Sequence, residues 1–321
     1  ALGLADRLDA NLAGAGNGGL WVGVAKARAD VVVLAHLDRP SFRVRALPDS
    51  QNAMLSPIDP DHRLTRPAHS SAHALRYDAE RGKLTVAAQG QVIADGEGSL
   101  GFRAEQGTIS WLDTVTFASA PWRDGGVVQG AGVDNCAGVL MALGAAAVLR
   151  QVEEALLEHN RRCLFIFPGY PGGSLNVMRW SAMAAQWPPV LGTVIVDGQA
   201  TGASGLQHGA GVACAFHADG YGLLVPINYQ QLAEDLAADF KRHTPVSVQR
   251  NRRGVPGGGA GLTGDGGRVL GFMGPPLSDP HPGQERVALK DIQAGIWWLS
   301  SFLAVVLNLI PAISVRYALG R

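Results

Sequence analysis

The chain has 321 residues, of which 47% are hydrophobic, so it can bury the core of one large α/β domain or of two smaller domains. Its 27 basic and 27 acidic residues balance, and without a net field to attract nucleic acid this class of partner is disfavoured. The cysteines are far apart, have no CxxC spacing and stand among apolar or small residues: Cys136, Cys163 and Cys214. Such usage is typical of buried, reduced thiols and predicts a cytoplasmic protein.

The first strong strand signal is the aliphatic, β-branched run Val31–Ala35, which is typical of a parallel strand covered on both faces. Residues 45–121 differ from it, because short alternating segments such as Lys83–Ile93 and Gly107–Leu112 are separated by glycines and charged turns. This stretch predicts a small all-β domain inserted into the chain, with a role in contacts or access. The α/β domain would then be discontinuous, comprising residues 1–44 and 122–321.

Beyond the insertion, helical and strand patterns alternate. Helical spacing covers Ala137–Arg150 and Ser174–Gln186, and apolar strand-like runs cover Leu164–Phe167 and Val190–Val196. This alternation predicts an α/β fold with a doubly wound, mostly parallel sheet and helices on both of its faces.

Two later segments each allow two interpretations. The glycine-rich stretch Gly254–Gly267 lacks the strand-to-helix setting and the Lys-Ser/Thr ending of a phosphate-binding loop, so we expect a mobile loop at the surface or at a pocket edge. The uncharged segment Ile292–Val315 is long enough to span a bilayer. Its recurring polar residues and Pro311 favour a buried closing helix over membrane insertion.

Two polar motifs follow predicted strands, at the sheet edge where open α/β folds place their ligand sites. His36-Leu-Asp38 comes directly after Val31–Ala35, and Asp197 comes directly after Val190–Val196. A histidine in this position can bind a metal through one ring nitrogen, while Asp38 accepts a hydrogen bond from the other and fixes the tautomer. Each motif alone is more often an ordinary hydrogen-bonded turn.

Two more candidates precede predicted helices. Asp134-Asn-Cys-Ala-Gly138 follows a glycine-rich approach, and Asp134 is either an N-cap or a carboxylate that bridges two metals. In the second reading Gly138 would let the helix pack closely against the site. His281 lies between two prolines that hold its backbone extended just before the closing helix, and alone it would be a loop histidine.

The order of these motifs resembles that of the TET-type metallo-aminopeptidases, a family that includes glutamyl and deblocking aminopeptidases. In that family a His-x-Asp strand end, an Asp-Asp-x-x-Gly helix start, a Glu-Glu pair, a strand-end Asp and a late His follow one another, with a β domain inserted after the first strand. Three further segments of this chain are similar to family motifs: Thr263-Gly-Asp265, His281-Pro-Gly-Gln-Glu285 and His208-Gly209.

The resemblance implies a role for each matched residue. One metal, zinc or a similar divalent ion, would be bound by His36, Asp134 and Asp197, with Asp38 orienting His36. A second metal would share Asp134, take His281 and need a glutamate from the loop after Leu164–Phe167. In this loop Gly169 stands at the position of the family's general base, and Tyr170 stands at the position of the glutamate ligand.

Both carboxylates of the family's Glu-Glu pair are therefore missing, and the chain has no Asp or Glu from His159 to Val196. General acid–base catalysis is worth about a hundred- to ten-thousandfold in rate, and Gly169 cannot supply it. A tyrosine phenol such as Tyr170, with an ordinary pKa of about 10, is a poor metal ligand and a poor base at neutral pH. We expect one bound ion in preference to two, or none.

Two interpretations of function stand. The protein is either a degenerate relative with weak or no peptidase activity, retained for binding, assembly or regulation, or an active aminopeptidase or amidohydrolase. The active form would use one metal or a carboxylate from elsewhere, such as Asp265 or Glu285. Residues lost from the sequence at this loop would be another explanation, but the unbroken match from Phe165 to Gly172 argues against it. The resemblance also implies a peptide or amino-acyl substrate and a homo-oligomer.

Overall fold

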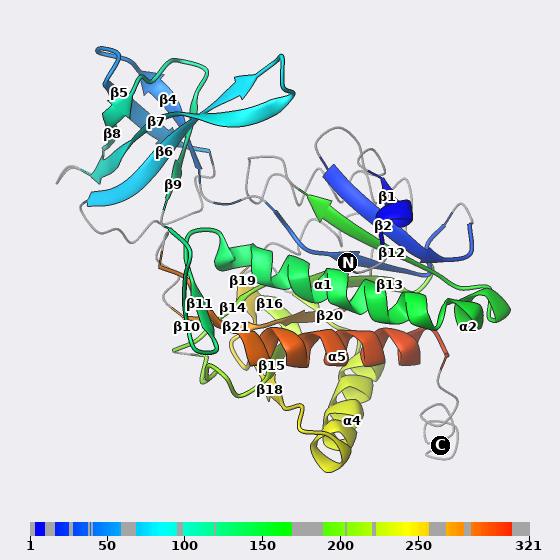
Figure 1. Ribbon diagram of the computed structural model, residues 1–321. Coiled ribbons are helices and arrows are strands. Elements are labelled where there is room, and N and C mark those ends of the chain that lie inside the picture. The colour runs from blue at the N-terminus through cyan, green and yellow to red at the C-terminus, as the bar shows by residue number, and fades with distance from the viewer. Residues whose placement is uncertain are drawn as a thin grey trace.

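The computed structural model describes residues 4–9, 17–25, 28–37, 39, 41–58, 69–94, 99–118, 120–168, 189–202, 204–219, 223–256, 268–278 and 284–309. Within these residues an α/β body carries one large sheet, and a closed β barrel stands apart from it (Figure 1). The predicted helix Ser174–Gln186 and most of the predicted loop Gly254–Gly267 lie outside the described residues.

The large sheet has eight strands, in the order β1 (Leu8–Asp9), β2 (Asn17–Gly23), β12 (Arg162–Pro168), β3 (Val31–Leu34), β13 (Gly192–Val196), β20 (Val269–Gly274), β15 (Val212–Ala215) and β18 (Val248–Arg250). Its central strands β12, β3, β13 and β20 run parallel to one another. The α/β prediction is confirmed. Antiparallel pairing occurs outside this centre, where β2 joins β12 and β15 joins β20.

Strand β3 shows why the central strands are continuous apolar runs. All four of its residues are buried. Because successive side chains of a strand point to opposite faces, Val31 and Val33 join the core cluster that contains helices, whereas Val32 and Leu34 join a separate cluster with Leu164. A strand with both faces covered has no position for a polar side chain, so its sequence does not alternate.

The helices α1 (Val133–Gln151) and α5 (Leu289–Val306) lie side by side against the sheet (Figure 1). Two glycines set their close approach. A Cβ atom added at Gly144 would lie 2.5 Å from the side chain of Ile296, and one added at Gly295 would lie 2.4 Å from that of Met141. The shorter α2 (Glu153–Glu158) follows α1, and α4 (Ile227–His243) contacts the middle of α5 through Phe240 and Trp298.

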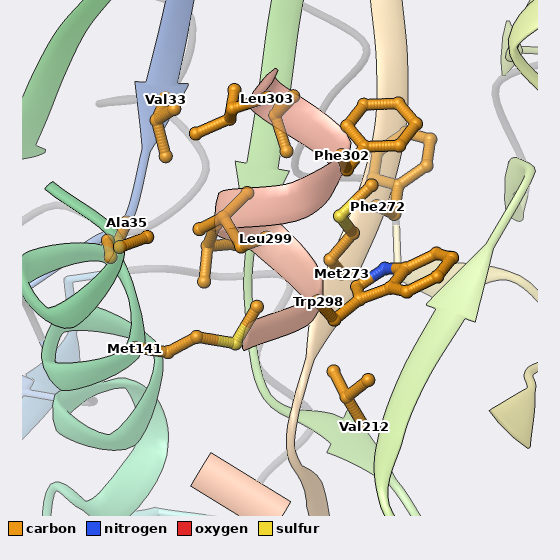
Figure 2. Packing of buried hydrophobic residues seen from close by; sticks show 14 of the residues in the cluster. Val33, Ala35, Met141, Val212, Phe272, Met273, Trp298, Leu299, Phe302 and Leu303 are labelled. Atoms are coloured by element: carbon orange, nitrogen blue, oxygen red, sulfur yellow. The ribbon is translucent and has the colours of Figure 1, made fainter. Parts of the chain in front are cut away.

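The predicted closing helix is α5, and its large apolar side chains fill the core. Trp298, Leu299, Phe302 and Leu303 are fully buried and face the sheet residues Phe272 and Met273 (Figure 2). The helix ends at Val306, and the rest of the segment through Val315 lies outside the described residues from position 310 onward. By length and composition alone one described helix, α1, could cross a membrane, and half of that stretch is buried in the fold.

A closed barrel is formed by strands between β3 and α1, in the order β4 (Ser41–Ala46), β5 (Asn52–Pro57), β8 (Leu100–Gly107), β7 (Lys83–Ala94), β6 (His69–Asp78) and β9 (Thr114–Phe117). It has its own apolar core, in which Phe42 and Phe117 meet edge to face with centroids 5.3 Å apart. The predicted strand at Gly107–Leu112 is wrong beyond Gly107. The chain turns there because the Asp113 carboxylate accepts a hydrogen bond from the Ser110 amide, at 2.7 Å.

Two small sheets complete the described architecture. One contains β10 (Trp122–Asp124), β11 (Val127–Gln129), β22 (Arg286–Ala288), β21 (Pro276–Ser278) and β14 (Gln199–Ala200), and the other contains β17 (Leu223–Leu224), β16 (His217–Asp219) and β19 (Val255–Pro256). A 3-10 helix η1 (Ala5–Arg7) precedes β1. Because β11 pairs with β22, the chain just before α1 lies beside the chain just before α5.

The thiol prediction is confirmed for two of the cysteines, since all of them are free and Cys163 and Cys214 are buried. Burial raises the pKa of Cys214 to about 12, so this thiol is inert at neutral pH. The prediction is wrong for Cys136, which is exposed in the first turn of α1. The buried residues at the start of α1 are Val133, Asn135, Ala137 and Gly138, and Cys136 lies on the outer side.

Asp291, in the first turn of α5, holds the turn that contains His208 and Gly209. Its buried carboxylate accepts hydrogen bonds from the amides of Gly209, at 2.6 Å, and Gly211, at 2.8 Å. Burial raises the pKa of Asp291, although these amides, His208 and Lys290 oppose the shift. The folded protein therefore holds the Asp291 proton more tightly than the unfolded chain does.

From this shift we expect stability to depend on pH. The contribution of Asp291 to the free energy of unfolding is fully present below its ordinary pKa of 3.8. It is lost as the pH rises through the higher pKa that Asp291 has in the folded protein. In Asp291→Asn, which keeps an acceptor oxygen but cannot titrate, that decline should be absent. Urea unfolding at a series of pH values from about 4 to 7 measures it. Parallel stability curves for the two proteins would contradict the assignment.

Candidate metal site

His36 lies just beyond the carboxyl end of β3, on backbone that is still bonded to the neighbouring strand. The Ala35 amide donates to the Ile166 carbonyl at 3.1 Å, and the Leu37 amide donates to the Pro168 carbonyl at 2.6 Å. The chain is therefore fixed on both sides of the histidine, whose ring is partly exposed. A ligand on fixed backbone needs little rearrangement to bind.

Asp134 lies in the first turn of α1, but it is not the N-cap. The cap residue is Gly132, in the left-handed region at φ 82°, and as a glycine it has no side chain of its own to cap the helix. Asp134 and Asn135 have non-helical backbone angles, and the peptide bond between them is cis. The N-cap interpretation of Asp134 is therefore wrong, since Gly132 holds the cap position.

Glu285 stabilises the turn before Asp134. It is 5% exposed, and its carboxylate accepts hydrogen bonds from the amides of Gly132, at 2.7 Å, and Val133, at 3.0 Å. Its carbonyl also accepts a hydrogen bond from the Gly130 amide at 3.0 Å. A negative charge at these amides is favourable because they carry the positive end of the helix dipole. On the outer side of the same turn, the exposed Arg39 packs over Gly132.

Asp197 follows β13, the neighbour of β3 in the sheet. Its amide donates to the Met273 carbonyl at 2.9 Å, so this position is fixed as well. Strand β20 comes so close that a Cβ atom at Gly274 would lie 1.7 Å from the Asp197 carbonyl oxygen. Glycine is required there for the two strand ends to meet.

The structure brings His36, Asp134 and Asp197 together. Their ligand atoms all lie within 4.8 Å of one another. His36 Nε2 lies 3.2 Å from Asp197 Oδ1 and 3.8 Å from Asp134 Oδ1. One imidazole nitrogen with two carboxylates is a donor set that suits a zinc ion with a fourth position left open. The described residues therefore fit one divalent ion.

Comparison with solved structures identifies the architecture. An aminopeptidase from the archaeon Desulfurococcus kamchatkensis superposes with a TM-score of 0.70 over 92% of this chain and 84% of its own, at 16% identity. The TET1 peptidase of Pyrococcus horikoshii gives a TM-score of 0.66 over 90% of this chain and 86% of its own, at 15% identity. The chain has an aminopeptidase-like fold.

Proteins described under other activities share this aminopeptidase-like fold. A protein from Thermotoga maritima described as an endoglucanase gives a TM-score of 0.60 over 96% of this chain and 90% of its own, at 17% identity. No protein-family model matches the sequence, and the comparison with curated proteins finds no match. The likenesses thus establish the fold, and the reaction depends on the side chains at the site.

Five residues of the sequence-based site fall outside the described residues: Asp38, Gly169, Tyr170, Asp265 and His281. The roles assigned to them stay predictions. Asp38 would orient His36, Gly169 and Tyr170 stand where the base and a ligand are missing, Asp265 is an alternative carboxylate, and His281 would bind a second metal. Sequence reasoning also missed two contributors, namely Glu285 as the partner of the α1 amides and Asn135, whose side chain bonds to the backbone on both sides of Asp197. The signal for Glu285 was its place four residues after His281 in a family-like motif.

Proposed function

We propose that the protein binds one divalent metal ion, with zinc preferred, through His36, Asp134 and Asp197, and that it is a degenerate metallo-aminopeptidase with weak or no peptidase activity. The observation that carries this proposal is the convergence of the three ligand groups within 4.8 Å. The aminopeptidases among the structural neighbours support the class of chemistry.

A divalent ion held there supplies Lewis-acid polarisation of a carbonyl group. The protein's own residues bind and orient. His36 presents Nε2 to the two carboxylates, which leaves Nδ1 as the nitrogen that Asp38 would orient. The ring is then held in the tautomer that binds a cation. The remaining requirement of a peptidase is a group that moves a proton to the leaving amine.

The sequence supports weak activity because such a proton-transfer group is missing from the expected loop. Gly169 and Tyr170 stand at the positions of the family's two glutamates, and neither can do the work of a carboxylate. No Asp or Glu occurs anywhere between His159 and Val196 to take over that work. Of the two alternative carboxylates, Glu285 is engaged with the amides of Gly132 and Val133 and is almost fully buried. Asp265 is the other candidate on which an active enzyme would depend.

Substrate, assembly and location follow as further parts of the proposal. A peptide or amino-acyl ligand suits a site built to hold one metal in an aminopeptidase-like fold. The Pyrococcus horikoshii peptidase is described as assembling into a tetrahedron or an octahedral shell, and this supports a homo-oligomer. A cytoplasmic location is supported by the free cysteines.

Metal content and turnover together test the proposal. We expect purified protein that has been loaded with zinc and dialysed to retain about one equivalent, and to hydrolyse aminoacyl p-nitroanilides at least about a hundredfold more slowly than an intact family enzyme. Two equivalents of metal with full turnover would overturn the degenerate-site proposal. No metal uptake would overturn the proposed metal site.

Restoring the lost carboxylates tests the alignment of the loop. In the double variant Gly169→Glu and Tyr170→Glu, metal uptake should rise towards two equivalents, because a missing ligand and a negative charge return to the site. Gly126→Glu is the matched control, since it adds a carboxylate at a turn where no atom lies within 4 Å of a new Cβ. Equal uptake by both variants would show that Gly169 and Tyr170 do not occupy the assigned positions.

A further inference from the structure

The side-chain amide of Asn135 bridges the two backbone segments that carry the proposed carboxylate ligands. Asn135 directly follows Asp134 and is 1% exposed. Its Nδ2 donates to the Val196 carbonyl at 2.8 Å, and its Oδ1 accepts from the Gly198 amide at 3.2 Å. Because Val196 and Gly198 flank Asp197, one amide holds the backbone on both sides of this ligand.

The chemistry of the two partners selects an amide. Val196 offers a carbonyl, which needs a donor, and Gly198 offers an N–H, which needs an acceptor. Asparagine presents one of each on a single carbon without a charge, whereas an ionised carboxylate only accepts. Asn135 therefore matches both partners and adds no further negative charge beside Asp134 and Asp197.

The space around the amide is shaped to hold it. A Cβ atom at Gly138, in the first turns of α1, would lie 2.1 Å from Asn135 Oδ1 and 2.8 Å from its Cγ. A Cβ atom at Gly198 would lie 2.0 Å from the Leu277 side chain and 3.3 Å from Asp134 Oδ1. Glycine at position 138 thus leaves room for the Asn135 amide, and glycine at position 198 leaves room for Leu277 and Asp134 at the end of β13.

We infer that Asn135 is a positioning residue that sets the separation of the Asp134 and Asp197 carboxylates, and that Gly138 provides the room it needs. The inference rests on the proposed metal site, since it concerns how two of its ligands are held. Outer groups that hold metal ligands typically contribute about 10- to 100-fold to metal affinity. We assign a contribution of the same size to the Asn135 amide in this site.

Two variants remove this bridge in different ways. Asn135→Leu keeps the branched shape of the side chain and deletes both hydrogen bonds. Gly138→Ala leaves Asn135 in place but forces its amide to move. Since alanine is a better helix former than glycine, helix propensity alone predicts that Gly138→Ala is harmless or stabilising. Gly144→Ala is the matched control, because it adds the same methyl group to α1 against Ile296 and away from the ligands.

The affinity for Co²⁺ is measured by titration of the full chain, followed by visible absorption, at a temperature where each metal-free protein is folded. We expect Asn135→Leu and Gly138→Ala to bind Co²⁺ about 10- to 100-fold more weakly than wild type. Gly144→Ala should keep wild-type affinity even if its melting temperature changes. Wild-type affinity in both bridge variants would overturn the inference.

Amide hydrogen exchange of the metal-free protein separates this inference from the proposed function. Exchange at Gly198 should be at least about tenfold faster in Asn135→Leu and Gly138→Ala than in wild type or Gly144→Ala. Unchanged exchange at Gly198 would refute the bridge. If wild type takes up no metal, the proposed metal site falls, while this exchange measurement still decides whether Asn135 holds the two segments together.

Discussion

Asp134→Ala is expected to lower the affinity of the protein for zinc by more than about a hundredfold, because losing a residue that merely orients a ligand already costs about 10- to 100-fold. Asp134 approaches His36 Nε2 to 3.8 Å and belongs to the single cluster found among the described residues. Its removal leaves one carboxylate and one imidazole, too few ligands for tight binding. Isothermal titration with Zn²⁺ measures the change.

The control for this prediction lies at the other end of the same helix. Asp6 forms an ion pair with Arg150, in the last turn of α1, so Asp6→Ala removes a carboxylate from a contact of α1 without touching the site. We expect it to leave zinc affinity unchanged. If Asp134→Ala bound zinc as tightly as Asp6→Ala, the ion would have to be bound elsewhere and the proposed metal site would be wrong.

Trp298→Ala is expected to lower the free energy of unfolding by about 3–5 kcal/mol, the usual cost of removing a large aromatic side chain from a packed core. Trp298 is fully buried, contacts Phe240 edge to face at 5.6 Å and lies beside Leu299 and Met273 (Figure 2). The neighbouring side chains are held in place by α4, α5 and β20 and cannot collapse fully into the cavity. Urea unfolding at neutral pH measures the loss.

Trp297 provides a matched control for this stability prediction, because it is the preceding residue of the same helix and is 50% exposed. Trp297→Ala should cost no more than about 1 kcal/mol, since most substitutions at exposed positions have small effects. Comparable losses in the two variants would show that α5 is not packed through Trp298. A larger loss in Trp297→Ala would place the opposite face of the helix in the core.

The centre of the fold could be predicted because its strands are buried on both faces. Val31–Ala35 and Leu164–Phe167 are apolar throughout, and this composition indicates covered parallel strands. Strand β2 gave no comparable signal, since Asn17–Gly23 contains three glycines, and its antiparallel pairing to β12 depends on contacts distant in sequence. The segment at Gly107–Leu112 misled because apolar residues there occupy a turn held by Asp113.

The ligands of the site were predictable for a different reason. His36 and Asp197 each follow a central strand, and neighbouring parallel strands bring their carboxyl ends to one edge of a sheet. The roles of Asn135 and Glu285 could not be predicted in this way. They depend on non-helical backbone angles at Asp134 and Asn135 and on the pairing of β11 with β22, neither of which leaves a periodic pattern in the sequence.

The position of the site relative to the barrel has a consequence for motion between the two parts of the molecule. The chain leaves the body for the barrel just after His36, and it rejoins the body at β10 and β11, which pair with β22 and lead into the turn before Asp134. An ion bound at the site would link the segment that leads into the barrel, at His36, to the segment that follows it, at Asp134. Ion binding and barrel orientation would then be thermodynamically coupled, and each would influence the other to the same extent.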